Sequence, residues 1–175
     1  NELMAHSYSY IHSIPTTGLR FFTVYGPWGR PDMALFKFTQ AMTNNEPIQI
    51  NNNGKHARDF TYIDDIVHGV YKVLIKPPKK DSSNISPSSS SAPWKILNIG
   101  RGEKIELMAF IEIIEKYFNK EFKKVFAPLQ LGDVETTFCD TSILQSEYQY
   151  KPTVSVEEGV KKFLDWYVNF YKIEF

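Results

Sequence analysis

The spacing of apolar residues along the chain predicts an alternation of strands and helices. Over 105–118, apolar residues recur every three or four positions, as they do on the buried face of an amphipathic helix. Between Leu19 and Val24 the apolar residues are nearly consecutive, which is typical of a strand covered on both faces in a parallel sheet. Because segments of both kinds follow one another through short connections, the pattern predicts an α/β fold.

The same spacing, together with the residues that interrupt it, predicts the other elements. We expect helices over 1–13, 33–43, 66–76, 141–148 and 156–170, and strands over 17–25, 48–50, 58–63, 95–99 and 125–126. Aspartate or serine stands where several of these helices begin, and such residues accept hydrogen bonds from the free amides of a first turn. The predicted N-caps are Asp32, Asp64 or Asp65, Asp140, and Ser155, which forms a capping box with Glu158.

Apolar positions also define the face that each helix is expected to bury. In the last helix this face consists of Val156, Val160, Phe163, Leu164, Tyr167 and Phe170. In the helix that ends before Pro77 it consists of Ile66, Val67, Val70, Val73 and Leu74. The helix over 33–43 carries Leu35, Phe38 and Met42 on one face, and the first helix repeats Leu3, Met4, Tyr8 and Ile11 at helical spacing. These aromatic and aliphatic stripes predict core rather than a cofactor site.

Residues 79–93 interrupt the pattern, because serine replaces most of the apolar residues there. Such a segment has too little apolar surface to offset the entropy that is lost when it is ordered. Closing a loop costs only about 0.6 kcal/mol more for each doubling of its length, so an insert of this kind is tolerated. We therefore predict a flexible surface insert rather than a linker between two folds.

Composition and charge narrow the class of ligand. The chain has 175 residues, enough for one domain, and its 20 basic residues balance its 20 acidic residues. This balance argues against nucleic acid and against an acidic membrane surface, so a small molecule is the expected ligand. No apolar run approaches the roughly 20 residues that span a bilayer. The single cysteine, Cys139, excludes an intrachain disulfide, and the reducing cytosol is the expected location.

Individual residues indicate a site only weakly. The sequence contains no glycine-rich phosphate loop, no metal-ligand spacing among its four histidines and no nucleophile elbow, so neither a catalytic group nor a metal site is predicted. The histidines are expected to face solvent, and Cys139 is expected to be a small apolar filler.

Polar residues nevertheless occur in four places where a plain core would not have them. Thr23 interrupts an apolar strand, where it either binds a ligand or bonds to backbone. Arg30 lies in a stiff Gly/Pro loop that suits aiming a guanidinium at a carboxylate or phosphate, although an exposed loop arginine fits as well. Arg58 and Asp59 form either a structural ion pair or part of a site, and the segment from Gln130 to Asp133 forms either a polar turn or part of a site.

Three segments together resemble a known family. They are LRFFTVYGPWGRPDMA over 19–34, RDFTYIDD over 58–65, and LQLGDV over 129–134. They resemble the UDP-sugar epimerases of the extended short-chain dehydrogenase/reductase family, and within it the UDP-glucuronate 4-epimerase branch. The resemblance covers nearly the whole chain outside the serine-rich insert.

The resemblance implies that this chain is the C-terminal part of an extended Rossmann-type enzyme. Residues 1–30 would be the tail of the Rossmann domain and 31–175 mainly the UDP-sugar-binding domain, with the elements near 58–76 and 95–100 returning to the Rossmann part. In the family, the glycine-rich NAD loop, the Ser/Thr and the Tyr-x-x-x-Lys pair precede these segments, so no catalytic residue is expected in this chain. Activity would then require a Rossmann half from another chain or from a longer gene product.

The family reaction implies roles for particular residues. Tightly held NAD oxidises the sugar C4 hydroxyl, the 4-keto sugar turns over, and hydride returns to the opposite face. Thr23 and Arg30 are expected to hold the sugar carboxylate, because a 4-keto glucuronate is a β-keto acid that loses carbon dioxide when its carboxylate rotates freely. Arg58 is expected at the pyrophosphate and Asp133 at the ribose. The other expected substrate contacts are Gln130, the backbone of Met33 and Ala34, and, around uracil, Gln49 and Asn51, whereas Phe22 and Val24 are expected to pack near the nicotinamide.

Two alternatives remain open at this point. The first is another UDP-sugar epimerase, or a decarboxylase, of the same family. The second, from a different class, is a non-catalytic remnant or binding module that lacks the NAD half. The expected partners are a UDP-sugar, with UDP-glucuronate as the leading candidate, and either the missing Rossmann half or a second copy of the chain.

Overall fold

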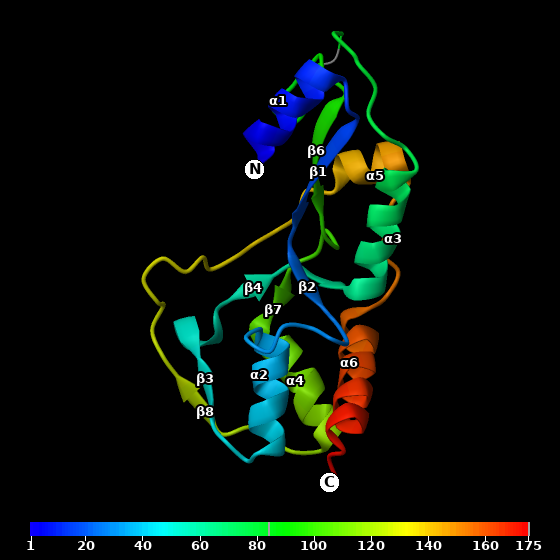
Figure 1. The fold of residues 1–175 in the computed structure, drawn as a ribbon. Helices are drawn as coiled ribbons and strands as arrows, with labels where there is room; N and C mark the ends of the chain where they lie inside the picture. Colours follow the sequence, from blue (N-terminus) through cyan, green and yellow to red (C-terminus); the bar gives the residue numbers. More distant parts are fainter. Residues whose placement is uncertain (84, 175) are drawn as a thin grey trace.

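Helices and strands alternate along the chain, which confirms the predicted α/β class (Figure 1). The structure is a computed structural model that describes residues 1–83 and 85–174. The helices are α1 (Glu2–His12), α2 (Ala34–Thr43), α3 (Ile63–Leu74), α4 (Leu107–Phe118), α5 (Ser142–Tyr148) and α6 (Val156–Tyr171), with a 3₁₀ turn over Asn51–Gly54. The strands are β1 (Thr16–Phe21), β2 (Thr23–Tyr25), β3 (Ile48–Ile50), β4 (Ala57–Arg58), β5 (Phe60–Tyr62), β6 (Trp94–Ile99), β7 (Ile105–Glu106) and β8 (Lys124–Phe126).

The strand predicted over 17–25 is divided at Phe22, because the chain changes its pairing partner there. β1 runs parallel to β6, with Phe21 opposite Ile99. β2 runs parallel to β5, with Thr23 opposite Phe60. The amide of Phe22 donates to the Ile99 carbonyl at 3.1 Å, and the amide of Thr23 donates to the Asp59 carbonyl at 3.1 Å. The break therefore places Thr23 at the point where two parallel pairs meet.

Two smaller pairs complete the strands. β3 runs parallel to β8, and β4 runs antiparallel to β7. The extended segment predicted over 58–63 is divided in the same way, since Asp59 separates β4 from β5 and Ile63 already belongs to α3. Pairing with β4 also explains why the helix predicted from residue 105 begins at Leu107.

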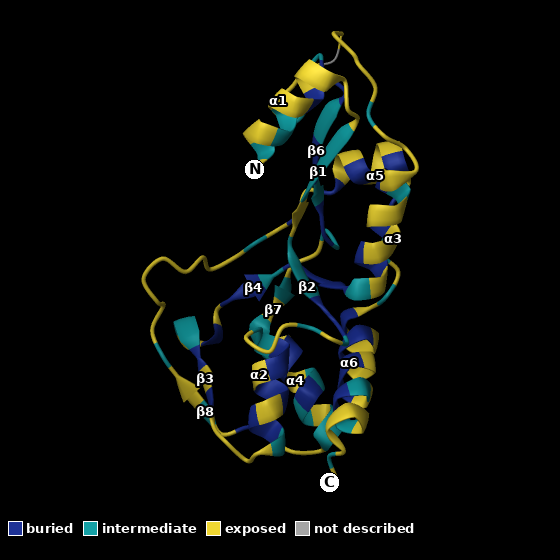
Figure 2. Ribbon diagram, in the orientation of Figure 1, coloured by how far each residue is buried: buried dark blue, intermediate teal, exposed yellow. Residues whose placement is uncertain are grey.

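Two hydrophobic clusters hold these elements together (Figure 2). The larger cluster joins α2, α4 and α6 to β2, β3 and β5, and includes Phe110, Ile111, Ile114, Val160 and Leu164. The smaller one joins α3, β6 and the region of α5 through Ile66, Val73, Leu97, Ile99, Leu144, Tyr148 and Tyr150. At Gly159 of α6, an added Cβ would lie 2.3 Å from the Tyr25 hydroxyl, so only glycine allows this close packing of helix on strand.

The predicted buried faces are confirmed in part. Leu35, Phe38 and Met42 of α2 are buried, as are the predicted residues of α6 up to Tyr167. The expectations for Phe170 and for Val67, Val70 and Leu74 of α3 are wrong, because these side chains are exposed. The apolar face expected for α1 is exposed as well, at Leu3, Met4, Tyr8 and Ile11. Coverage of both faces of the first strand is also wrong within this chain, since Phe21 is 53% exposed.

Two of the predicted N-caps are wrong. Met33, not Asp32, precedes α2, and the Asp32 carboxylate binds Arg30 instead. α3 begins so early that Asp64 and Asp65 both lie in its first turn. Asp65 instead accepts hydrogen bonds from the amides of Thr153 and Val154 at 2.9 and 3.0 Å, which ties the start of α3 to the segment before α6.

The N-cap prediction for α5 is also wrong, whereas the prediction for α6 is confirmed. Thr141 takes the N-cap position of α5, although Asp140 still accepts the amide of Ser142 at 3.0 Å. Ser155 caps α6, and its hydroxyl accepts the amide of Glu158 at 3.1 Å, as the capping-box pattern predicts.

The serine-rich insert closes a short turn beside β6. Ser86 and Ser89 form an antiparallel bridge, and Ser89 also bridges to Lys95. The predicted flexibility of 79–93 stays a prediction, and residue 84 lies outside the described residues. In the described part of the chain, no helix combines the length and the apolar character that crossing a bilayer requires.

Candidate functional site

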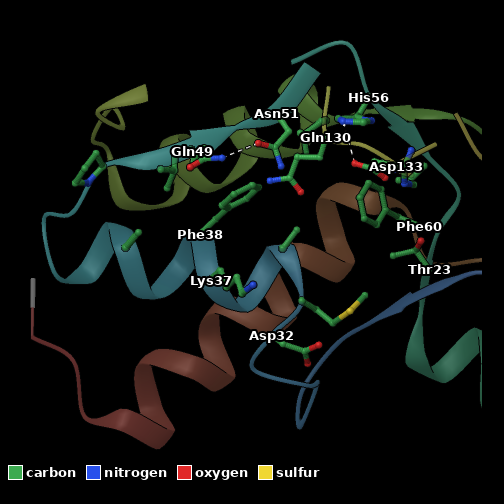
Figure 3. A pocket seen from close by; sticks show the side chains of 17 residues that line it. Thr23, Asp32, Lys37, Phe38, Gln49, Asn51, His56, Phe60, Gln130 and Asp133 are labelled. Carbon is green, nitrogen blue, oxygen red and sulfur yellow. Dashed lines mark hydrogen bonds and ion pairs between the residues drawn. The ribbon is translucent and has the colours of Figure 1, made fainter. Parts of the chain in front are cut away.

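A cavity of about 580 Å³ opens between α2, β3 and the segment that follows β8 (Figure 3). Every predicted substrate residue except Arg30 lines it: Thr23, Met33, Ala34, Gln49, Asn51, Arg58, Gln130 and Asp133. The remaining lining residues are Asp32, Lys37, Phe38, Ala41, Pro47, Ile48, His56, Phe60 and Leu107. Residues that are far apart in the sequence therefore meet at one concave surface.

The N-terminus of α2 forms one side of the cavity. Met33 has an extended backbone and precedes Ala34, the first residue of the helix. No side chain caps the first turn of α2. The free amide groups of a helix N-terminus favour the binding of an anion. Lys37, one turn further along, also lines the cavity and adds a positive charge on this side.

The opposite side is formed by β3 and the turn that follows it. Gln49 is exposed between the buried Ile48 and Ile50, so strand alternation turns its side chain towards the cavity. Its Nε2 atom donates to Oδ1 of Asn51 at 2.9 Å. Figure 3 shows the two amides side by side along this edge. The remaining amide atoms are available for the edge of a planar polar ring.

Arg58 and Asp133 close the third side. The Arg58 guanidinium donates from NH2 to Oδ1 of Asp133 at 3.1 Å, and from NH1 to the Glu135 carbonyl at 2.9 Å. Arg58 is only 21% exposed at its side chain, and Asp133 36%. The ion pair therefore fixes the segment after β8 against β4.

The turn that carries Gln130 and Asp133 has a tight geometry. The Asp133 amide donates to the Gln130 carbonyl at 3.1 Å, and Gly132 has φ +85°. Glycine is favoured at this position because a side chain would strain a backbone with positive φ. The polar-turn interpretation of this segment is thus correct, and the same turn presents two polar side chains to the cavity.

Aromatic packing makes part of the wall rigid. Phe60 stacks on Phe110 with ring centroids 4.3 Å apart and an interplanar angle of 15°. Phe110 is fully buried in the larger cluster, so Phe60 is held in place from behind. Thr23 lies opposite Phe60 in the β2–β5 pair, which positions its hydroxyl-bearing side chain beside this wall.

Arg30 and the two predicted cofactor contacts lie outside the cavity lining. The Arg30 guanidinium donates to both carboxylate oxygens of Asp32, at 3.0 and 2.5 Å, and both side chains are exposed. These hydrogen bonds lower the pKa of the Asp32 carboxyl. Val24 instead packs against the smaller hydrophobic cluster, and Phe22 is half-buried at the strand break.

Asp59 is not the ion-pair partner of Arg58. It is fully buried, and its Oδ1 accepts the Arg101 amide at 2.8 Å and the Thr61 hydroxyl at 3.1 Å. Its Oδ2 accepts the amides of Gly102 at 2.8 Å and Cys139 at 3.3 Å. Asp59 thereby fastens two loops to the junction of β4 and β5, immediately beside the site.

The expectation for Cys139 is confirmed, whereas that for the histidines fails at one position. Cys139 is buried, and this burial, with the Asp59 carboxylate nearby, raises the pKa of its thiol to about 12. His56 is only 5% exposed and lines the cavity. The sequence does indicate this position of His56. Residues two apart in an extended segment share a face, and His56 precedes Arg58 by two positions. Among the described residues, no group of three metal-ligating side chains occurs.

Comparison with known proteins agrees with this geometry. Residues 1–86 match the sequence profile of the NAD dependent epimerase/dehydratase family. Protein CapI of Staphylococcus aureus is 50% identical over 98% of this chain and 53% of its own length. A probable UDP-glucuronate 4-epimerase of Rhizobium meliloti is 45% identical over 98% of this chain and 52% of its own length.

Solved structures share the fold. The UDP-glucuronic acid 4-epimerase of Bacillus cereus, crystallised with UDP-glucuronic acid and NAD, superposes with a TM-score of 0.81 at 32% identity, and the match covers 97% of this chain and 50% of that one. The chain thus has the fold of part of an extended short-chain dehydrogenase/reductase. Residues 1–86 belong to the NAD-dependent epimerase/dehydratase family, and the chain as a whole spans about half the length of the curated relatives it matches.

Proposed function

We propose that this chain is the nucleotide-sugar-binding half of an NAD-dependent UDP-glucuronate 4-epimerase. The observation that carries the proposal is the single cavity in which the predicted uracil, ribose and diphosphate contacts meet. The sequence predicted these residues from a resemblance, and the fold brings them together from α2, β3, β4 and the turn at Gly132. Relatives whose names specify UDP-glucuronate support the choice of sugar.

In this proposal each side of the cavity binds one part of the substrate. Gln49 and Asn51 present amide donors and acceptors to the edge of uracil. Asp133 accepts hydrogen bonds from the ribose hydroxyls. Arg58 and the first-turn amides of α2 stabilise the diphosphate, because a cation and a helix N-terminus both favour negative charge. The sugar then extends towards Thr23.

The reaction also requires NAD, which when bound would take the hydride from the C4 carbon, while the C4 hydroxyl gives its proton to a base, and would supply the hydride for the return to the opposite face. The residues of this chain fit a supporting role only. Phe22 is apolar, half-buried and adjacent to Thr23 at the strand break, so it would pack against a flat ring beside the sugar, whereas Val24 packs against the smaller hydrophobic cluster. Binding of the cofactor's phosphates and the proton transfer at C4 would fall to the half that carries the glycine-rich loop and the Tyr-x-x-x-Lys pair.

Calorimetric titration of the chain with UDP, UDP-glucuronate and UDP-glucose tests the proposal. We expect all three to bind, with UDP-glucuronate roughly tenfold tighter than UDP-glucose, because a charge-assisted bond contributes about 1.5 to 3 kcal/mol. Arg30→Ala should abolish this preference, whereas the exposed control Arg20→Ala should leave it unchanged. To bind the sugar carboxylate, the Arg30 guanidinium must first release the Asp32 carboxylate. Failure of the wild-type chain to bind UDP would contradict the proposal.

A second candidate is an enzyme of the same family that acts on another UDP-sugar. It is favoured by the placement of Arg30, which binds Asp32 outside the cavity. In that case Arg30→Ala leaves the preference among sugars unchanged while UDP still binds.

The non-catalytic alternative predicts that mixing the chain with a separately produced NAD-binding half yields neither bound NAD nor epimerisation.

A further inference from the structure

His56 is a buried residue of the cavity wall, with an oxygen atom close to each ring nitrogen. Its Nδ1 atom lies 3.3 Å from the Glu135 carbonyl oxygen. Its Nε2 atom lies 3.4 Å from Oδ2 of Asp133 and has no partner that meets hydrogen-bond geometry. Figure 3 shows the ring next to the Asp133 carboxylate, to which a dashed line joins it. Because the Nε2 atom is inaccessible, His56 cannot use it to contact a ligand directly.

The two oxygens of Asp133 therefore face two different basic side chains. Oδ1 accepts from Arg58 NH2 at 3.1 Å, and Oδ2 faces His56. His56 directly precedes β4 and Arg58 is its last residue, so both side chains reach the carboxylate from one short segment. The Glu135 carbonyl oxygen also lies near both basic side chains, because Arg58 NH1 donates to it at 2.9 Å and His56 Nδ1 lies 3.3 Å from it.

The protonation state of His56 decides how many of its contacts are favourable. A neutral imidazole carries one N–H, so one of its two nitrogens would turn a lone pair towards an oxygen lone pair. The imidazolium donates from both nitrogens, to the Glu135 carbonyl and to the Asp133 carboxylate. The charged groups around the ring are Arg58 of β4 and Asp133 of the turn, while Glu106 of β7 and Glu135 have exposed side chains.

We propose that His56 is a positioning residue that, in its protonated form, fixes the Asp133 carboxylate and the turn over 130–135 for nucleotide binding. The inference rests on the proposed function, because that function gives Asp133 the role of binding the nucleotide. It predicts that the cavity is better ordered when both ring nitrogens carry a proton than when only one does.

The test compares the wild-type chain with His56→Gln, and uses His68→Gln, on the exposed side of α3, as a matched control. UDP affinity is measured at pH 5.5 and pH 8.0, and amide hydrogen exchange of 127–138 is measured without ligand at both pH values. We expect His56→Gln to weaken UDP binding about tenfold at pH 5.5, with the gap narrowing to within about twofold at pH 8.0. We also expect faster exchange of 127–138 in this variant at pH 5.5 only.

Comparing each variant with the wild-type chain at the same pH removes the titration of UDP itself. Equal affinity and equal exchange at pH 5.5 would overturn the inference and leave the proposed function intact. An equal loss at both pH values would also overturn it, because it would assign His56 a merely structural role. If the wild-type chain fails to bind UDP, the proposed function is wrong, and the exchange measurement alone then decides whether protonated His56 holds the turn.

Discussion

Replacing Asp59 with asparagine is expected to lower the free energy of unfolding by about 3 kcal/mol, because it disrupts a buried and fully bonded charge. Each Asp59 oxygen accepts two hydrogen bonds, from the amides of Arg101, Gly102 and Cys139 and from the Thr61 hydroxyl. An asparagine NH₂ in place of either oxygen would point at these donors. At least one backbone amide would then be buried without a partner. Chemical denaturation monitored by circular dichroism measures this loss.

The matched control for this substitution is Asp64→Asn, in the exposed first turn of α3. It changes the same functional group, yet it removes only a favourable interaction with the helix dipole, worth about 0.3 to 1 kcal/mol. Similar losses for the two variants would show that Asp59 does not fasten the loops around the site. A change in the slope of the unfolding free energy against denaturant concentration, rather than in the midpoint concentration, would indicate an altered unfolded state.

Replacing Arg58 with alanine is expected to weaken UDP binding about 30-fold, which corresponds to about 2 kcal/mol. The substitution removes the proposed diphosphate contact and also releases Asp133, since the Arg58 guanidinium bonds to this carboxylate and to the Glu135 carbonyl. The loss should shrink as salt is raised, because part of it is the attraction between opposite charges. Isothermal titration calorimetry at two ionic strengths measures both effects.

Arg20→Ala serves as the control, because Arg20 is an exposed arginine of β1 that pairs with Glu2 and does not line the cavity. It removes the same charge without touching the proposed site. If both variants bind UDP equally well, Arg58 does not contact the diphosphate. Weaker binding by both would instead indicate a diffuse effect of net charge.

Most of the fold follows from the spacing of apolar residues. The faces of α4 and α6 are dictated by helical periodicity, and Ser155 marks the start of α6 through its hydroxyl. The break at Phe22 does not follow from this pattern, because it depends on β5 and β6, which come from remote parts of the sequence. Exposure of Phe21 and of one side of α3 likewise depends on what surrounds them in space, and local patterning carries no such information.

The site was predictable where short motifs resemble those of a family. Thr23, Arg58 and Asp133 line one cavity although they are far apart in sequence. The position of His56 was not predicted, because its burial arises from the turn at Gly132 folding over β4. The Arg30–Asp32 pair was missed as well, because the choice between a bound and a free guanidinium depends on the conformation of a loop.

An NMR titration of the isotopically labelled chain with UDP tests the central claim most directly, because it locates the ligand without requiring catalysis. We predict that the largest amide shifts occur at Ala34, Gln49, Arg58 and Asp133, which surround the cavity. A second cleft, lined by Lys76, Lys95 and Glu147, lies beside the serine-rich insert. Shifts confined to that cleft, or the absence of any saturable shift, would contradict the account.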